Sequence, residues 1–271
     1  LTPDHLDRHN TFVGYCQAKQ KIFLQQQEND WLILNADDLE TRKMATQAKG
    51  KVLFFSRQHI LEEGFCVSDG WLAVKKKEKI TRLLSTEELR IKGSHNLENA
   101  LAAAAAGWVM GVEAESIAYS LRTFLGVEHR LEPVLTYHGV TYINDSKGTN
   151  PDAAIKALEA YDRPIVLIAG GKSKGSDFLP FALKIKERVK ELVLVGQAAP
   201  EIAEAVKKVG YTHIHYVSSF VEAVKKASHL AKEGEIVLLS PACASFDLFA
   251  NFEQRGQVFK ELVHRLAQEK N

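Results

Sequence analysis

The stretch INDSKGTNP, residues Ile143 to Pro151, stands between two segments of different periodicity. Alternating apolar residues before it predict a strand, and the DAAIKALEAY that follows it predicts a helix. Asp145, Lys147 and Thr149 therefore lie on a strand-to-helix loop, where free backbone N–H groups and the positive end of the helix dipole favour an anion. The alternative is a simple capped helix start, with Thr149 or Asn150 as the N-cap and Lys147 as a solvated charge.

A strand–helix rhythm continues from this stretch to the end of the chain. We expect strands at 141–144, 164–169, 191–195, 213–217 and 235–240, and helices at 152–160, 178–189, 200–209, 220–232 and 252–268. Apolar strands that alternate with amphipathic helices predict an α/β fold with a mainly parallel sheet covered on both faces. Ligands of such sheets bind beyond the carboxyl ends of the strands. The loops INDSKGTN, AGGKSKGSD, VGQ and SPACASFD all fall at that edge, which favours the anion site.

The residues before this region are organised differently, without a regular alternation. The expected elements are a helix at 11–27, strands at 30–37 and 51–56, a hairpin at 65–75, an alanine-rich helix after residue 93 and a helix at 112–124. The hairpin turns at an Asp-Gly pair, and Ser94 or Asn96 can cap the alanine-rich helix. The stretch Gly126 to Glu132 interrupts the pattern, so we place a domain boundary there, between residues 128 and 129.

Size and composition agree with two domains of an ordinary globular protein. The chain has 271 residues, with 35 basic and 34 acidic ones, a balance that indicates neither nucleic acid nor a membrane surface as a partner. Its longest apolar run, Ala100 to Met110, is too short for membrane insertion. Three scattered cysteines without metal-ligand spacing favour a reducing cytoplasm. The chain starts without Met or a secretory signal, so we expect further sequence upstream.

Eight motifs follow one another in an order typical of one enzyme family: DHLDRH, YCQAK, LNADD, GSHNLENALAA, GVEHRLEPV, NDSKGTNPDA, AGGKSKGSDF and SPACASFDLFANFEQRGQVF. Together they resemble the Mur ligase family, from the first residue to about Leu266. The resemblance implies the end of a central ATP-binding domain at 1–128 and a Rossmann-like C-terminal domain, which binds the amino acid, at 129–271. It also implies that a UDP-sugar domain is missing, and the chain contains no G-x-x-x-x-G-K-[ST] phosphate loop.

The chemistry implied by this resemblance is ATP-dependent amide-bond formation. A carboxylate takes the γ-phosphoryl group of ATP, an amine attacks the acyl phosphate, and phosphate leaves. The implied partners are UDP-N-acetylmuramoyl-L-alanine, D-glutamate, ATP and Mg²⁺, in a cytoplasmic monomer of peptidoglycan precursor synthesis. Two alternatives stay open: a folylpolyglutamate-synthase-like ligase, and a non-catalytic binding fragment because the phosphate loop is absent.

Two residues match family positions at the metal ion. His5 matches a histidine that binds a second Mg²⁺, although Mg²⁺ prefers oxygen ligands and an ordinary surface histidine is the alternative. Lys19 matches a catalytic lysine that family members carry as a carbamate, an anion able to hold the metal. Carbamylation needs a neutral amine, so the site would have to lower the pKa of this lysine by burial or nearby cations. The alternative for Lys19 is a solvated surface charge.

Four residues match family positions at the nucleotide. The Asn96 amide would pair with the adenine edge, and the Arg130 guanidinium would bind phosphate oxygens. Lys147 would contact the γ-phosphate as a catalytic cation, and Asp145 would bind ribose or orient that lysine. The alternatives are a helix cap for Asn96 and a linker salt bridge for Arg130.

Five residues match the family's pocket for D-glutamate: Thr149, Lys174, Ser245, Phe246 and Phe252. Lys174 would face a carboxylate, with Lys172 left open as its competitor, and Thr149 and Ser245 would supply hydroxyls. Phe246 stands where we expect leucine, a change that a backbone contact would survive. Cys243 lies beside these residues and is interpreted as a packing residue rather than a nucleophile.

Overall fold

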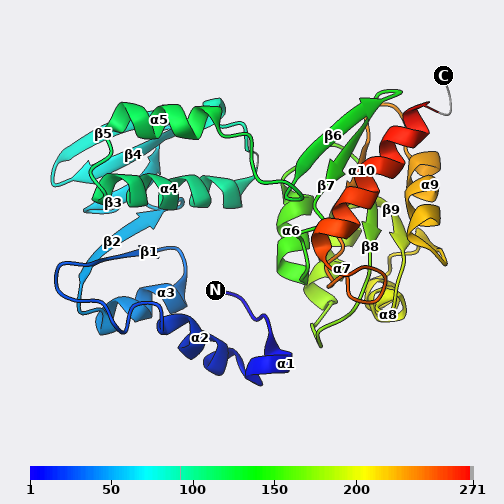
Figure 1. Cartoon of the computed structure of the whole chain (residues 1–271), viewed down its shortest axis with the longest axis horizontal. Helices are drawn as coiled ribbons and strands as arrows, with labels where there is room; N and C mark the ends of the chain where they lie inside the picture. Colours follow the sequence, from blue (N-terminus) through cyan, green and yellow to red (C-terminus); the bar gives the residue numbers. More distant parts are fainter. Residues whose placement is uncertain (92, 269–271) are drawn as a thin grey trace. The chain divides into compact units, whose positions relative to one another are not determined.

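The computed structural model describes residues 1–91 and 93–268. It divides the chain into two compact units, Leu1–Leu125 and Gly126–Asn271, each with its own sheet (Figure 1). Among the described residues, no helix has the length and apolar character that crossing a membrane requires.

The first unit is built on a five-stranded sheet in the order β1-β2-β3-β4-β5. Its strands are β1 (Trp31–Asn35), β2 (Lys51–Ser56), β3 (Gly64–Ser68), β4 (Trp71–Lys76) and β5 (Lys79–Ser85). The first three run parallel, and the last three form an antiparallel meander. The β3–β4 turn has positive φ at Asp69 (50°) and Gly70 (78°), as the Asp-Gly pair predicts. Strand β5 was not expected, because its first four residues are not buried and show no apolar alternation.

The helices of the first unit cover both faces of its parallel strands (Figure 1). They are α1 (Leu6–His9), α2 (Phe12–Gln20), α3 (Leu39–Met44), α4 (Ser94–Val109) and α5 (Ala114–Thr123), with short 3₁₀ turns at Ala45–Gln47 and Thr86–Glu88. Helix α2 ends before the expected Gln27, since the chain turns there and buries Phe23 against Cys16 and Leu34. The expected cap of α4 is wrong: Gly93, with φ 98°, is the N-cap, and Asn96 lies inside the helix.

The second unit contains a six-stranded sheet in the order β10-β9-β8-β11-β7-β6. Its strands are β6 (Glu132–Tyr137), β7 (Val140–Asn144), β8 (Ile165–Ala169), β9 (Val189–Leu194), β10 (Ile214–Tyr216) and β11 (Ile236–Leu239). All neighbours pair in parallel except β6 and β7, so the prediction of a mainly parallel sheet is confirmed. The edge strand β6 was not expected, because it includes Pro133, which only an edge strand or a bulge tolerates.

Helices cover both faces of this sheet (Figure 1). They are α6 (Pro151–Glu159), α7 (Leu179–Arg188), α8 (Ala199–Lys208), α9 (Phe220–Leu230) and α10 (Phe252–Gln268). Alternate residues of β8 enter opposite cores: Leu167 packs with α6, α7 and α8, whereas Val166 packs with α9 and α10. Every residue of β8 is buried, which explains its continuous apolar sequence.

Candidate functional site

Four loops meet at the carboxyl edge of the second sheet, as the sequence predicts. Strand β11 lies between β7 and β8, so the loop that follows it contacts the loops of both neighbours. Ala242 donates its N–H to the Gly148 carbonyl at 2.9 Å, and Gly170 donates to the Pro241 carbonyl at 2.9 Å. Lys172 and Ala244 exchange two backbone hydrogen bonds, at 2.8 and 3.1 Å. Ala198, after β9, donates its N–H to the Gly171 carbonyl at 2.7 Å, so the four loops form a continuous hydrogen-bonded edge.

Two glycines allow these loops to approach closely. A Cβ on Gly148 would lie 2.5 Å from Oδ2 of Asp145, and a Cβ on Gly171 would lie 2.3 Å from the Ala244 carbonyl oxygen. Gly171 also has φ 131°, which favours glycine. A side chain at Gly148 would push the β7 loop away from Ser240 at the end of β11, and one at Gly171 would push the β8 and β11 loops apart.

Asp145 is buried at the start of the β7 loop, with 4% of its surface exposed. Its Oδ2 accepts from the Ser240 hydroxyl at 2.7 Å, and its Oδ1 accepts from the Leu131 N–H at 3.2 Å. Burial raises the Asp145 pKa to about 7, although these hydrogen bonds and the charge of Arg130 act in the opposite direction. The described hydrogen bonds join the Asp145 carboxyl to Ser240 and Leu131, so its expected role toward Lys147 or a ribose stays a prediction.

Lys147 follows Asp145 by two residues in the same loop, and the charge of Arg130 acts on the Asp145 carboxyl. The Lys147 ammonium stands 4.6 Å from the centre of the Phe252 ring, a cation–π contact with the first residue of α10. The Lys147 N–H donates to the His129 carbonyl at 3.0 Å, which brings the segment around Arg130 to the same loop. Arg130 itself is exposed. Three residues predicted to face a nucleotide are thus gathered within the second unit.

The residues predicted for D-glutamate occupy the neighbouring loops. Ser245 is 1% exposed, and its buried hydroxyl oxygen has no hydrogen-bond partner among the described residues. Lys174 is half-buried and near enough to Cys243 for its charge to affect the thiol, whereas Lys172 is exposed. Burial raises the Cys243 pKa to about 12, so this thiol stays protonated at neutral pH, which suits a packing role.

Two further predicted pocket residues differ in exposure. Thr149 is half-buried just before Asn150, whose side chain caps α6 by accepting from the Ala153 N–H at 2.8 Å. The capped helix start is therefore real, and Asn150 rather than Thr149 is its N-cap. Phe246 has 66% of its surface exposed, so only its backbone or an outward-facing ring could meet a ligand.

In the first unit the predicted residues are not brought together. The His5 side chain is 52% exposed, and its Nε2 lies 3.7 Å from Oδ2 of Asp4. Lys19 is exposed, with its ammonium 5.3 Å from the centre of the Tyr15 ring, so the burial expected at a carbamate is lacking. Asn96 is buried within α4 and accepts from the Asn99 amide at 3.1 Å.

These residues do not by themselves fit a Mg²⁺ ion. In the described part of the chain, no group of three or more His, Cys, Asp or Glu donors converges around His5. The histidine and one carboxylate fall well short of the six oxygen ligands that Mg²⁺ prefers. The metal expected at His5 and Lys19 thus stays a prediction from resemblance.

Two domain families match the chain. The Mur ligase middle domain matches residues 1–107, and the Mur ligase glutamate ligase domain matches residues 129–243. The chain belongs to the Mur ligase family.

Curated relatives of this Mur ligase chain are considerably longer than it is. The UDP-N-acetylmuramoylalanine–D-glutamate ligase of Pelotomaculum thermopropionicum is 52% identical over 97% of this chain, which covers 58% of that protein. The enzyme of the same name from Desulfitobacterium hafniense is 51% identical over 98% of this chain, again with 58% of the relative covered. The chain therefore spans a little more than half the length of these relatives.

Solved structures share the fold of this Mur ligase chain at low identity. The MurF ligase of Thermotoga maritima, solved with ADP, has a TM-score of 0.67 and 18% identity, covering 97% of this chain and 60% of that one. Escherichia coli FolC, solved with ADP, has a TM-score of 0.69 and 18% identity, covering 98% of this chain and 61% of that one. The MurF ligase and FolC have nearly the same TM-score to this chain, so the fold alone does not choose between them.

Arg255 is a central residue of this Mur ligase edge that was not identified from the sequence. It is buried, and its Nε and Nη2 donate to the Ser146 hydroxyl and carbonyl at 2.9 and 2.8 Å. Both terminal nitrogens also donate to the Cys243 carbonyl at 3.2 Å, so one side chain joins the β7 and β11 loops. Burial lowers the Arg255 pKa to about 10. Arg255 lies four residues before Phe259, on the buried side of α10, and this helical spacing could have indicated that it is buried.

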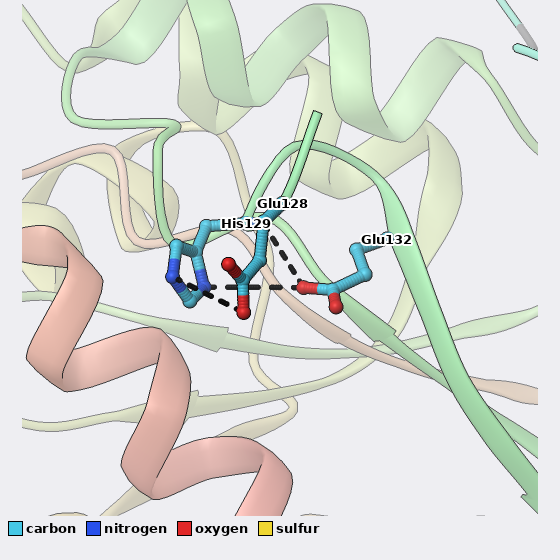
Figure 2. Close-up of side chains that lie close together, drawn as sticks. All are labelled: Glu128, His129 and Glu132. Carbon is cyan, nitrogen blue, oxygen red and sulfur yellow. Dashed lines mark hydrogen bonds and ion pairs between the residues drawn. The ribbon is translucent and has the colours of Figure 1, made fainter. Parts of the chain in front are cut away.

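One acidic cluster of the Mur ligase chain resembles a metal site, but its carboxylates are already paired with a lysine. Donor atoms of Glu128, His129 and Glu132 lie within 4.8 Å of one another, and Figure 2 shows the three side chains turned toward each other. The Lys260 ammonium forms ion pairs with both carboxylates. The Asn144 amide nitrogen lies 3.0 Å from Nδ1 of His129 and donates to Oε2 of Glu132 at 2.9 Å. We therefore describe this cluster as a salt-bridged network.

Proposed function

We propose that this chain forms part of a cytoplasmic ATP-dependent ligase that joins D-glutamate to UDP-N-acetylmuramoyl-L-alanine. The supporting observation from the structure is the carboxyl edge of the second unit. There a cation, Lys147, and a buried hydroxyl without a described partner, on Ser245, stand on adjoining loops. The identity of 52% to a protein of that activity supports D-glutamate rather than a folate substrate.

The proposed reaction assigns distinct work to these side chains. The muramyl carboxylate attacks the γ-phosphorus of ATP, and ADP leaves; Lys147 and Arg130 stabilise the charge on the transferred phosphoryl group. The D-glutamate amine then attacks the acyl carbon, loses a proton, and phosphate departs. Ser245 and Lys174 hold the carboxylates of D-glutamate during this attack. Removing one such charge-stabilising group typically lowers kcat by about 10²–10³-fold. The exposed His5 and Lys19, without further donors around them among the described residues, do not form a Mg²⁺ site by themselves.

Phosphate release tests this proposal directly. A protein that carries this chain together with its upstream region is supplied with ATP, and UDP-N-acetylmuramoyl-L-alanine and D-glutamate are each omitted in turn. We expect release only when both are present. Release with a folate and L-glutamate instead would move the chain to the folate ligases. If neither substrate pair gives phosphate release, but the protein still binds D-glutamate, the chain would belong to a non-catalytic binding module.

Lys147→Ala gives the sharpest variant of this assay. We expect phosphate release to fall by about 10²–10³-fold, since the developing phosphoryl charge loses its cation. The melting temperature should stay close to that of the wild type, because Lys147 is only half-buried. Lys225→Ala, which removes an exposed lysine from α9, is the matched control and should keep full activity. Full activity of Lys147→Ala would contradict the phosphate role.

A further inference from the structure

Arg130 stands between two residues with unusual backbone geometry. His129 has φ 64° and Leu131 has φ 44°, both in the left-handed region. Each such residue other than glycine costs roughly 1–2 kcal/mol, so it persists only where the surroundings hold it. The contacts that hold this segment therefore determine where Arg130 is presented.

The segment around Arg130 is bound to the β7 loop at two backbone positions. The Lys147 N–H donates to the His129 carbonyl at 3.0 Å, and the Leu131 N–H donates to Oδ1 of Asp145 at 3.2 Å. Residues on both sides of Arg130 thus contact the residues expected to act with it. The position of the Arg130 backbone relative to Lys147 is set by these bonds, whereas its side chain is exposed.

Asn144, the last residue of β7, fixes the ring of His129. The Asn144 Oδ1 accepts from the Ser146 N–H at 3.2 Å, which leaves its amide nitrogen to donate. That nitrogen lies 2.9 Å from Oε2 of Glu132 and 3.0 Å from Nδ1 of His129. The His129 Nδ1 must then accept a hydrogen bond, which places the ring proton on Nε2.

Glu132 and α10 enclose this arrangement from the other side. Oε2 of Glu132 also accepts from the His129 N–H at 3.0 Å (Figure 2). Oε1 of Glu132 is paired with Lys260 at 3.2 Å. A Cβ on Gly256 would lie 2.3 Å from the His129 Nδ1, so the ring rests directly on the backbone of α10. Only 7% of the His129 side chain is exposed to solvent.

We propose that His129, Asn144 and Glu132 are positioning residues that hold Arg130 in register with Lys147 for reaction at a nucleotide phosphate. The inference rests on the proposed ligase function. None of the three has to touch substrate; they act through the backbone of residues 129–131. Because misplacing a reacting group by about 1 Å can cost 10²-fold in rate, a loosened segment should lower catalysis without unfolding the unit.

His129→Gly is the central test, with His129→Asn as its conservative partner. Glycine accepts the left-handed backbone but removes the ring, whereas asparagine tolerates the same φ and keeps an acceptor near the position of Nδ1. In the ligase that contains this chain, we expect His129→Gly to raise the KM for ATP about 10-fold and lower kcat about 10-fold. The KM for D-glutamate should change less than about twofold. His129→Asn should restore most of the kcat and of the affinity for ATP that His129→Gly loses.

His138 supplies a matched control within the same unit. It is an exposed histidine with φ 47°, at the turn between β6 and β7, the opposite end of β7 from the site. His138→Gly makes the same chemical change at the same backbone conformation, and it should leave both KM values and kcat unchanged. An equal effect of the two substitutions would overturn the proposal, because it would reflect general loosening of β7.

Amide hydrogen exchange tests the network without any activity. In this chain, His129→Gly should speed exchange of the Lys147 and Leu131 amides at least about 10-fold, while amides of β8 keep their protection. Unchanged exchange at both amides, or normal kinetics for ATP, would overturn the positioning role. A wild-type protein that releases no phosphate would instead reject the ligase function, and the exchange result would still decide whether His129 holds the segment.

Discussion

The two units of the chain differ in how much of a candidate site each one builds by itself. In the second unit, residues far apart in sequence meet directly, such as Asp145 with Ser240 and Ser146 with Arg255. In the first unit, His5 and Lys19 are exposed, and no group of three metal donors forms around them among the described residues. Parallel strands that end at one edge of a sheet bring their loops together within a single unit. The exposed His5 and Lys19 side chains would need additional ligand groups to form a binding site.

Burial explains why the second unit is the more complete one. Apart from Glu235, the buried polar residues described in this unit lie at or beside the carboxyl edge: His129, Asn144, Asp145, Ser146, Ser240, Ser245 and Arg255. A polar group removed from water must find a partner, so these side chains fix one another's positions. The Ser245 hydroxyl is an exception among them, and an unpaired group at this edge is where a ligand would bind.

Arg255→Met should produce the largest change in stability and should affect only the second unit. The substitution leaves the Ser146 and Cys243 carbonyls without donors, which we expect to cost about 3–5 kcal/mol. All three tryptophans belong to the first unit, so their fluorescence follows its unfolding, whereas circular dichroism follows both units. The dichroism transition should move and the fluorescence transition should not. Arg163→Met removes an exposed arginine and is the control; an equal fluorescence shift in Arg255→Met would show that the two units do not unfold separately.

Asp145→Asn should give a smaller effect that depends on pH. Burial places the folded pKa at about 7 against an ordinary 3.8, so the folded state binds the proton more tightly. The stability contributed by this carboxyl is complete below about pH 4 and is lost as pH rises through 7. The free energy of unfolding of the variant, relative to that of the wild type, should therefore rise by about 2 kcal/mol between pH 5.5 and pH 8. Urea unfolding at the two pH values measures this difference.

The pH dependence of Asp145→Asn needs a control variant and has a result that would contradict it. Asp162→Asn changes a fully exposed carboxyl and should show no comparable gain at high pH. A gain of Asp145→Asn that is constant over the whole pH range would mean that the carboxyl is ionised throughout, and that Arg130 and Arg255 compensate for its burial.

Lys19→Ala should have the smallest effect of all. In this chain the side chain is exposed, so its loss should change the unfolding free energy by less than about 0.5 kcal/mol, as at Lys49→Ala. A solvated ammonium does not retain a carbamate, and ¹³C-bicarbonate should give no stable carbamate signal at Lys19 in the NMR spectrum of the chain. A stable signal would show that the first unit completes this feature alone, and it would remove the contrast between the two units.

The sequence by itself determined the architecture of the second unit and the loops of its site. The apolar alternation before INDSKGTNP and the helical spacing after it are local properties, so they are visible without a fold. The rhythm continues through five strands and five helices whose positions agree closely with the structure. Where the local pattern was weak, as in the polar β5 or the proline-containing β6, the strand escaped prediction.

Only the tertiary structure decided which side chains hold one another. Arg255 is separated from Ser146 by 109 residues, and Ser240 from Asp145 by 95, so no spacing in the sequence indicates these pairs. The sequence made Asn96 a candidate N-cap of α4, whereas in the structure Gly93 is the N-cap. His129 was not singled out from the sequence, and its contacts with Asn144 and Glu132 appear only in the fold. Partners of buried polar groups are chosen by packing, because the cost of an unpaired group arises only when water is excluded.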